Sequence, residues 1–206
     1  IEDPEVVILS IATRPDCLPE DVLDLLAQLN RQKPVWVELG LQTMHEESAR
    51  MIHRGYDLVC FEQAVRGLRS REIDVIVHTI LGLPGEGNKE VFHTIDYLNH
   101  MDIQGIKLQL LHILKGTQLG QIYLEQQEGQ EFVIPVTMEA YIDLVISCVE
   151  HLSPEITIHR LTGDGPKDLL LAPMWSTRKR TVLNEIHKEM KKRDAWQGKR
   201  YERSPL

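Results

Sequence analysis

A strand–turn–helix segment near the middle of the chain constrains the fold most. The β-branched apolar run Ile73–Val77 predicts a strand that is buried on both faces. The run continues into His78 and ends at the turn Gly82–Gly85, after which Asn88 is a suitable N-cap for a helix that reaches Tyr97. The segment therefore predicts one βα unit. In parallel α/β proteins, the side chains that follow such a strand lie at the edge where ligands bind.

Further apolar runs alternate with amphipathic helical patterns along the chain. We expect the other strands at 6–11, 35–41, 103–111 and 156–159, and helices at 19–30, 46–52, 58–69, 117–125, 138–151 and 177–193. This alternation predicts an α/β fold with a parallel sheet. Because crossovers in such sheets are right-handed, we predict a curved, partial (β/α) barrel with its helices outside. We expect the barrel to span residues 1–173 and a basic C-terminal helix and tail to span 174–206.

Length and composition are those of an ordinary globular domain. The 206 residues can bury one substantial core, and the hydrophobic fraction of 42% is typical. No apolar run approaches the roughly 20 residues that a membrane span needs, and the start of the chain does not resemble a signal peptide. Because the chain does not begin with Met, we expect an N-terminal part to be missing. Three scattered cysteines argue against a disulfide framework and predict a cytoplasmic protein.

The charge of the chain is divided unevenly. The net charge is −8, yet residues 178–203 hold ten Lys/Arg and four Asp/Glu. One interpretation of this basic segment is a solvated helix face. The other is a contact for phosphate, for which a nucleic acid is the obvious source.

Polar side chains follow or interrupt each predicted strand. They are Thr13 and Arg14, Glu38 and Gln42, His78, Lys107 and His112, and His159 and Arg160. A polar residue on a buried strand costs a few kcal/mol unless it has a partner, so the set predicts a binding mouth; the alternative is that strand ends simply meet solvent. His78 is open to three interpretations: a core histidine, a hydrogen-bond donor to a cofactor, or a metal ligand.

The order and spacing of several motifs resemble radical S-adenosylmethionine (SAM) enzymes. The motifs are Glu38–Thr43, Ile52–Gly55 and His78–Gly85, and they are closest to those of the Elongator catalytic subunit. Thr13–Asp16 fits the same pattern, and His159–Asp168 is similar to a narrower bacterial group of Elongator-like proteins. Some members of that group are linked to processing the wobble-uridine side chain of tRNA. The resemblance implies a radical SAM enzyme, with tRNA as the expected partner.

The resemblance also implies cofactor contacts. Gln42 matches a residue that holds the ribose or methionyl part of SAM, and Arg54 matches one that binds the methionyl carboxylate, a role suited to its planar fork. His78 matches a ribose contact, while Ile80 and Gly82 match a segment whose backbone flanks the adenine. Lys107 and His112 are weaker cofactor-binding predictions. Ala12 stands where several relatives have a carboxylate, so one expected contact is absent.

For the substrate, we expect contacts from the loop after the last strand and from the basic segment. The predicted residues are His159, Arg160, Asp164, Lys167, Lys191, Lys192 and Arg193. No residue is assigned a catalytic role. In the family, a reduced cluster passes an electron to SAM, and the resulting 5′-deoxyadenosyl radical abstracts hydrogen from the substrate, so a reductant is a further expected partner.

The chain departs from the family at the cluster. Relatives hold a [4Fe–4S] cluster with a Cys-x3-Cys-x2-Cys loop, whereas Cys17, Cys60 and Cys148 lie far apart here. We therefore expect the cluster ligands to lie in the missing N-terminal part, and this fragment alone to be inactive. Two alternatives remain: a metal-dependent barrel hydrolase that uses His78, His112 and His159, and a non-catalytic RNA-binding module of the same fold.

Overall fold

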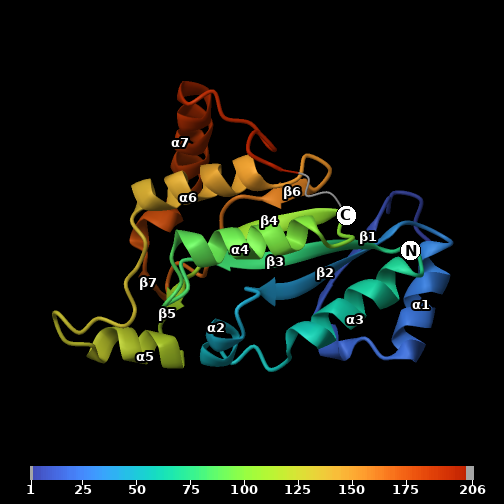
Figure 1. The fold of residues 1–206 in the computed structure, drawn as a ribbon. Helices are drawn as coiled ribbons and strands as arrows, with labels where there is room; N and C mark the ends of the chain where they lie inside the picture. The colour runs from blue at the N-terminus through green and yellow to red at the C-terminus, as the bar shows by residue number, and fades with distance from the viewer. Residues whose placement is uncertain (1, 203–206) are drawn as a thin grey trace. The chain divides into compact units, whose positions relative to one another are not determined.

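The computed structural model describes residues 2–202 (Figure 1). Its main sheet has five strands in the order β1 (Leu9–Thr13), β2 (Val35–Gln42), β3 (Asp74–Leu81), β4 (Gly105–Leu110) and β6 (Thr157–Arg160). The pairs β1–β2 and β2–β3 are parallel. Helices connect the strands, as a parallel sheet requires. The predicted α/β class with a parallel sheet is confirmed.

The chain forms two compact units. The first contains the residues up to Thr79 together with Tyr97–Lys107 and Glu155–His159. Its helices are η1 (Pro15–Cys17), α1 (Glu20–Asn30), α2 (Glu46–Met51) and α3 (Leu58–Arg69). The N-terminus of α3 is capped by Asp57, which accepts a hydrogen bond from the Cys60 backbone N–H, as its sequence position predicts.

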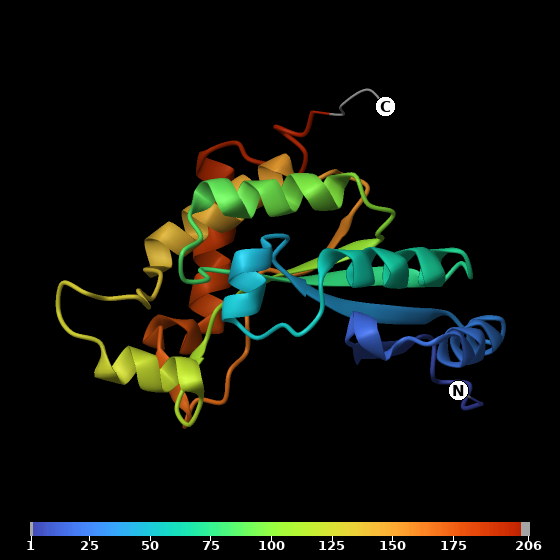
Figure 2. The ribbon, with the colours of Figure 1, turned by 60° about the horizontal axis from the view of Figure 1, so that its bottom comes forward.

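Strand β2 has one covered and one open face. Val35, Val37, Leu39 and Leu41 are at most 1% exposed, and α1 and α3 both contact the strand. Figure 2 shows α3 running alongside β2. The alternate residues, Trp36 to Gln42, are only partly buried. Because successive side chains of a strand point to opposite faces, the second face of β2 is available for polar chemistry.

The second unit contains Ile80–Asp96, Leu108–Pro154 and the residues from Arg160 onward. It includes α5 (Gln118–Glu125), α6 (Met138–His151) and α7 (Lys179–Lys192), with most of α4 (Asn88–Asn99). Helix α7 packs against α6, which it crosses in Figure 1. A small antiparallel sheet pairs β5 (Ile113–Leu114) with β7 (Leu170–Ala172), and η2 (Met174–Thr177) follows it.

Three details differ from the sequence-based expectations. The first strand is Leu9–Thr13 rather than 6–11, since the ladder with β2 begins where Leu9 pairs with Val35. The segment 160–173, expected to be a loop, contains β7; this strand has only three residues, so its pairing with β5 rather than its own pattern defines it. The segment Met174–Thr177 is a 3-10 helix. The predicted domain boundary after residue 173 stays a prediction.

Within the described part of the chain, no helix is both long enough and apolar enough to span a membrane. Arg203, the last residue of the basic segment, lies outside the described residues.

Candidate functional site

The C-terminal end of β2 has an unusual backbone. Gln42 has a φ of 67°, a left-handed conformation that is uncommon for a residue other than glycine. The pairing of β2 with β3 also shifts register between Gly40 and Gln42. Such an irregularity re-aims a side chain, and strained backbone of this kind is concentrated at functional sites. The position is the one at which the resemblance implies a SAM contact.

Arg54 holds this backbone in place. Its Nη1 donates to the carbonyl oxygens of Leu41 (3.2 Å) and Thr43 (2.8 Å), the two residues that flank Gln42. Its Nε donates to the Tyr56 carbonyl (2.8 Å), and its Nη2 donates to Oε1 of Glu46 (2.9 Å). The Arg54 side chain is 1% exposed. Its contacts in the structure are therefore with the chain itself, and its binding of a SAM carboxylate stays a prediction.

The Gln42 amide lies over Gly40. A Cβ built on Gly40 would lie 2.7 Å from Gln42 Nε2, so a larger residue there would displace the amide. The Tyr56 hydroxyl donates to the Gly40 carbonyl (2.7 Å). The guanidinium groups of Arg14 and Arg54 each lie about 5 Å from the centre of the Tyr56 ring, at 5.3 and 5.1 Å. These contacts fix the amide beside Gly40, the one residue of β2 without a side chain.

A polar network occupies the open face of the same sheet. Glu38 accepts hydrogen bonds from Ser10 Oγ (2.9 Å) and His78 Nε2 (2.7 Å), and it also forms an ion pair with the Lys107 ammonium. The four residues come from β1, β2, β3 and β4. Of the predicted cofactor residues, the structure thus brings His78 and Lys107 together, and His78 pairs with Gly40, beneath the Gln42 amide.

The electrostatics of the network keep Glu38 ionised. Burial raises the pKa of this carboxyl, but the hydrogen bonds from Lys107, Ser10 and His78 outweigh burial and lower the pKa to about 2. At neutral pH the carboxylate can only accept, so the His78 Nε2 carries the proton of their hydrogen bond. The network orients one imidazole and one ammonium group on the open face.

His159 and Trp36 lie next to this network. Their rings meet edge to face with centroids 5.3 Å apart. The imidazole lies against Gly105, where a Cβ would come within 2.5 Å of His159 Nε2. Burial and the nearby Lys107 charge lower the pKa of His159, so the ring is neutral at pH 7. Of the predicted substrate residues, His159 is the one that belongs to the first unit.

The remaining predicted cofactor residues belong to the second unit. Gly82 has a φ of 83°, and a Cβ there would lie 2.7 Å from Val136, which explains the glycine of the turn after β3. Ile80 lies on β3 two residues before it. His112 Nε2 lies 3.1 Å from Ser176 Oγ, and its ring packs against Gly163 and Gly165. Burial lowers the pKa of His112.

The loop after β6 gathers part of the predicted substrate set. Asp164 accepts from Lys179 Nζ (2.6 Å) and lies 3.8 Å from Arg160. The Lys179 hydrogen bond lowers the pKa of Asp164. Lys167 is exposed on the same loop. Lys179, on α7, was not among the predicted site residues.

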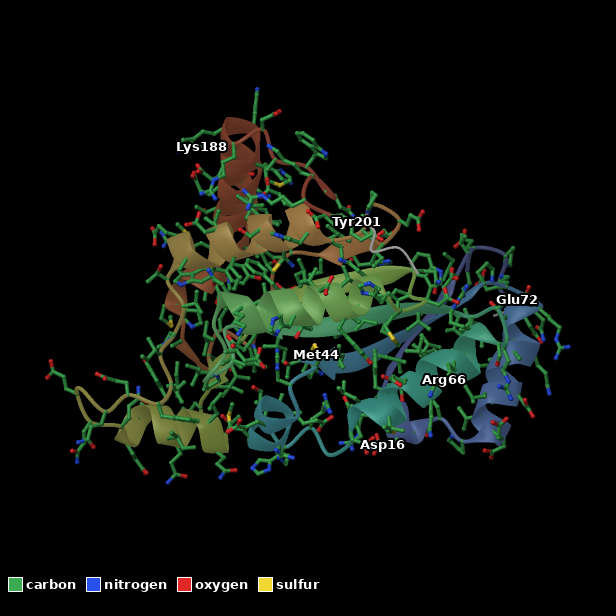
Figure 3. The ribbon with its side chains drawn as sticks, viewed as in Figure 1. Asp16, Met44, Arg66, Glu72, Lys188 and Tyr201 are labelled. Carbon is green, nitrogen blue, oxygen red and sulfur yellow. The ribbon has the colours of Figure 1, made fainter. Side chains whose placement is uncertain are left out.

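The basic end of α7 is partly neutralised. Lys192 and Arg193 pair with Glu189, and Arg193 also pairs with Asp143 of α6. Lys191 is exposed and has no ion pair within residues 2–202. Figure 3 shows Lys188 on the same helix with its side chain extending outward, and it pairs with Glu185. The charge available to a polyanion is therefore smaller than the composition indicates.

Sequence reasoning noticed Glu38 but did not assign it a role, and it overlooked Ser10 and Trp36. The alternation within β2 contained the signal: Val37, Leu39 and Leu41 share the covered face, so Trp36, Glu38 and Gln42 share the other. The pattern does not indicate which cation pairs with Glu38, because Lys107 lies 69 residues further along the chain.

The cysteines do not form a cluster site in the described residues. Cys17 is exposed and Cys60 partly buried, whereas Cys148 is fully buried in α6, where burial raises the pKa of its thiol to about 12. Within residues 2–202 there is also no group of three or more His, Cys, Asp or Glu side chains that could hold a metal ion. This chain therefore does not supply three thiolates to an iron–sulfur cluster, and the hydrolase alternative has no ligand set among these residues.

Comparison with known proteins identifies the family to which the chain is related. Residues 1–98 match the radical SAM superfamily model, and residues 103–192 match the radical SAM C-terminal domain model. Uncharacterized protein YtqA of Bacillus subtilis is 46% identical over 97% of this chain and 60% of its own length. Protein YhcC of Escherichia coli K12 is 35% identical over 90% of the chain and 59% of its own length. The chain thus spans about 60% of the length of these relatives.

Elongator-like proteins are also similar. A tRNA uridine(34) acetyltransferase of Methanocaldococcus infernus is 26% identical over 91% of this chain and 34% of its own length. The solved structure of the archaeal Elp3 from the same organism, with an N-terminal deletion, superposes with a TM-score of 0.77 over 93% of this chain and 43% of that chain, at 19% identity. This likeness confirms the predicted partial-barrel fold. The chain belongs to the radical SAM superfamily and is an Elongator-like relative within it.

Proposed function

We propose that this chain is the SAM-binding and substrate-binding part of a radical SAM enzyme that modifies the side chain of a tRNA wobble uridine. The observation that carries the proposal is the strained, clamped Gln42 beside the Glu38 network on the open face of the parallel sheet. Similarity to a tRNA uridine(34) acetyltransferase supports the choice of substrate. The [4Fe–4S] cluster is proposed to be held by cysteines outside this chain.

The residues present fit SAM at this edge of the sheet. The Gln42 amide offers both a donor and an acceptor to the ribose or methionyl part, and His78, oriented by Glu38, stands at the position that the resemblance gives to a ribose contact. Bound to a reduced cluster, SAM supplies a carbon radical that abstracts hydrogen. The chain's own residues bind, orient and exclude water, and none of them is assigned a proton-transfer step.

The decisive experiment uses the full-length protein. We expect anaerobic iron–sulfur reconstitution to give a brown protein that releases 5′-deoxyadenosine from SAM under reduction, and that releases it faster with unmodified tRNA. The 206-residue chain alone should do neither. Chromatography measures the 5′-deoxyadenosine that is released with and without tRNA. A reconstituted full-length protein that binds tRNA and leaves SAM intact would favour the non-catalytic RNA-binding alternative.

The basic end of α7 gives a second expectation for the same function. Replacing Lys191, Lys192 and Arg193 together with Glu should weaken tRNA binding in a gel shift, most clearly at low salt, because each phosphate contact adds to the salt dependence. Since Lys192 and Arg193 are already paired with Glu189, Lys191→Glu alone should account for most of the loss. Equal affinity of the variants at every salt concentration would identify this segment as a solvated helix face.

A further inference from the structure

The Lys107 ammonium has unused hydrogen-bonding capacity. It carries three N–H donors, and within residues 2–202 its side chain bonds to Glu38 alone. The side chain is 14% exposed, so most of its surface is covered by the protein. A largely buried donor without a partner costs free energy that a bound acceptor recovers. Lys107 can therefore donate a hydrogen bond to an acceptor atom of a ligand.

The position of Lys107 in the sheet indicates the sheet edge from which a ligand reaches its ammonium group. Trp36 precedes Glu38 by two residues on β2, and its ring meets that of His159 across the open face. Gln42 follows Glu38 by four residues toward the C-terminal end of the strand, and its amide lies over Gly40. The network, which includes the predicted SAM contact His78, thus lies between an aromatic contact toward the strand N-termini and Gln42 toward the C-termini. A ligand that enters from the C-terminal edge meets Lys107 after passing Gln42.

The charges of the network limit the chemistry of that ligand. Glu38 stays ionised because its pKa is about 2, so its charge balances that of Lys107, and His159 is neutral. A balanced site favours a neutral acceptor over a second anion, since an anion would lie close to Glu38. His159 has no hydrogen-bond partner among residues 2–202; its Nε2 edge packs against Gly105, which leaves Nδ1 for a ligand.

We propose that Lys107, held by Glu38, contacts a base carbonyl oxygen of the substrate pyrimidine, with His159 beside it, and is not a SAM contact. This inference rests on the proposed function and names the part of the site that the base occupies. A uracil ring carries two carbonyl acceptors flanking one N–H donor, a pattern that an ammonium and a neutral imidazole can both serve. Glu38 is then a positioning residue.

The test measures binding by the full-length, cluster-reconstituted protein. Lys107→Met keeps the length of the side chain and removes its donors. We expect it to weaken the binding of an anticodon stem–loop RNA about tenfold, as the loss of a charge-assisted hydrogen bond predicts, and to change SAM affinity less than about twofold. Lys107→Arg should recover part of the RNA affinity. Lys89→Met, at an exposed site on α4, is the matched control.

Two further comparisons show whether the acceptor belongs to the base or to a phosphate, and whether Lys107 contacts the RNA or SAM. On a stem–loop with an abasic wobble position, wild type and Lys107→Met should bind equally; a persistent tenfold difference would show a phosphate contact and overturn the assignment to the base. A loss of SAM affinity that matches the loss of RNA affinity would return Lys107 to the cofactor site and overturn the proposal. Failure of the proposed function itself is distinct, because wild-type protein would then bind no stem–loop, or would bind it and leave SAM intact, whichever way the Lys107 variants behave.

Discussion

Replacing Arg54 with alanine is expected to lower the free energy of unfolding by about 3–5 kcal/mol, because the buried guanidinium donates to three backbone carbonyls and one carboxylate. The Arg54 side chain is 1% exposed, and its removal takes one of two donors from Glu46, which is 37% exposed and also accepts from the Leu58 backbone N–H. It also leaves the carbonyls of Leu41, Thr43 and Tyr56 without a donor, and each unsatisfied buried group costs about 1–3 kcal/mol when water cannot replace the bond. Urea denaturation followed by circular dichroism measures the change.

The matched control is Arg66→Ala. Arg66 lies on α3 with a side chain that is 66% exposed, and it pairs with Glu62 one helical turn away. Such a pair contributes about 0.3–0.5 kcal/mol. Equal losses in the two variants would contradict the clamping role that the hydrogen bonds give to Arg54.

The same residue allows a test of how SAM is held. In full-length protein, Arg54→Lys should weaken SAM binding, measured by calorimetry. If Arg54 acts by fixing the backbone around Gln42, the affinity for decarboxylated SAM falls by the same factor. If the guanidinium binds the methionyl carboxylate, as the resemblance implies, only the affinity for SAM falls. Unchanged affinity for both would remove Arg54 from the site.

The sequence predicted the repeating architecture because the signals for it are local. The β-branched run before His78, the turn at Gly82–Gly85 and the cap at Asp57 each act within a few residues. These signals identified β2, β3 and the helices between them. The short strand β7 was missed because three residues contain no period, and its pairing with β5 depends on a partner more than 50 residues away.

In the candidate site, too, the features set by local sequence were predicted, and those set by long-range contacts were not. Gln42 and His78 were identified through motifs that lie within single segments. The left-handed backbone at Gln42 was not predicted, because the features that accompany it, the hydrogen bonds of Arg54 to Leu41 and Thr43 and the register shift with β3, form only after the chain folds. The partnership of Glu38 with Lys107 likewise depends on the order of strands in the sheet.

Replacing Glu38 with glutamine is expected to remove an acid-sensitive part of the stability. The folded-state pKa of Glu38 is about 2, below its ordinary value of 4.5. A carboxyl whose pKa is lowered by folding stabilises the protein fully above its unfolded pKa, and this stabilisation is lost as the pH falls toward the folded pKa. At neutral pH the contribution is at most about 3 kcal/mol, and less to the extent that water screens the pair.

The measurement compares wild type and Glu38→Gln by urea denaturation between about pH 7 and pH 2.5, a range that crosses the ordinary pKa of 4.5 and approaches the folded-state value of about 2. The wild type should be more stable at neutral pH, since the variant leaves the charge of Lys107 without its partner. The difference should narrow below about pH 4.5, because this carboxyl then takes up a proton in the unfolded wild type while it stays ionised in the folded protein, which the glutamine variant cannot do. A difference that stays constant over this range would show that the variant disturbs packing rather than the ion pair. Because Ser10 and His78 also donate to this carboxylate, a narrowing difference would establish that one ionised group organises the open face of the sheet.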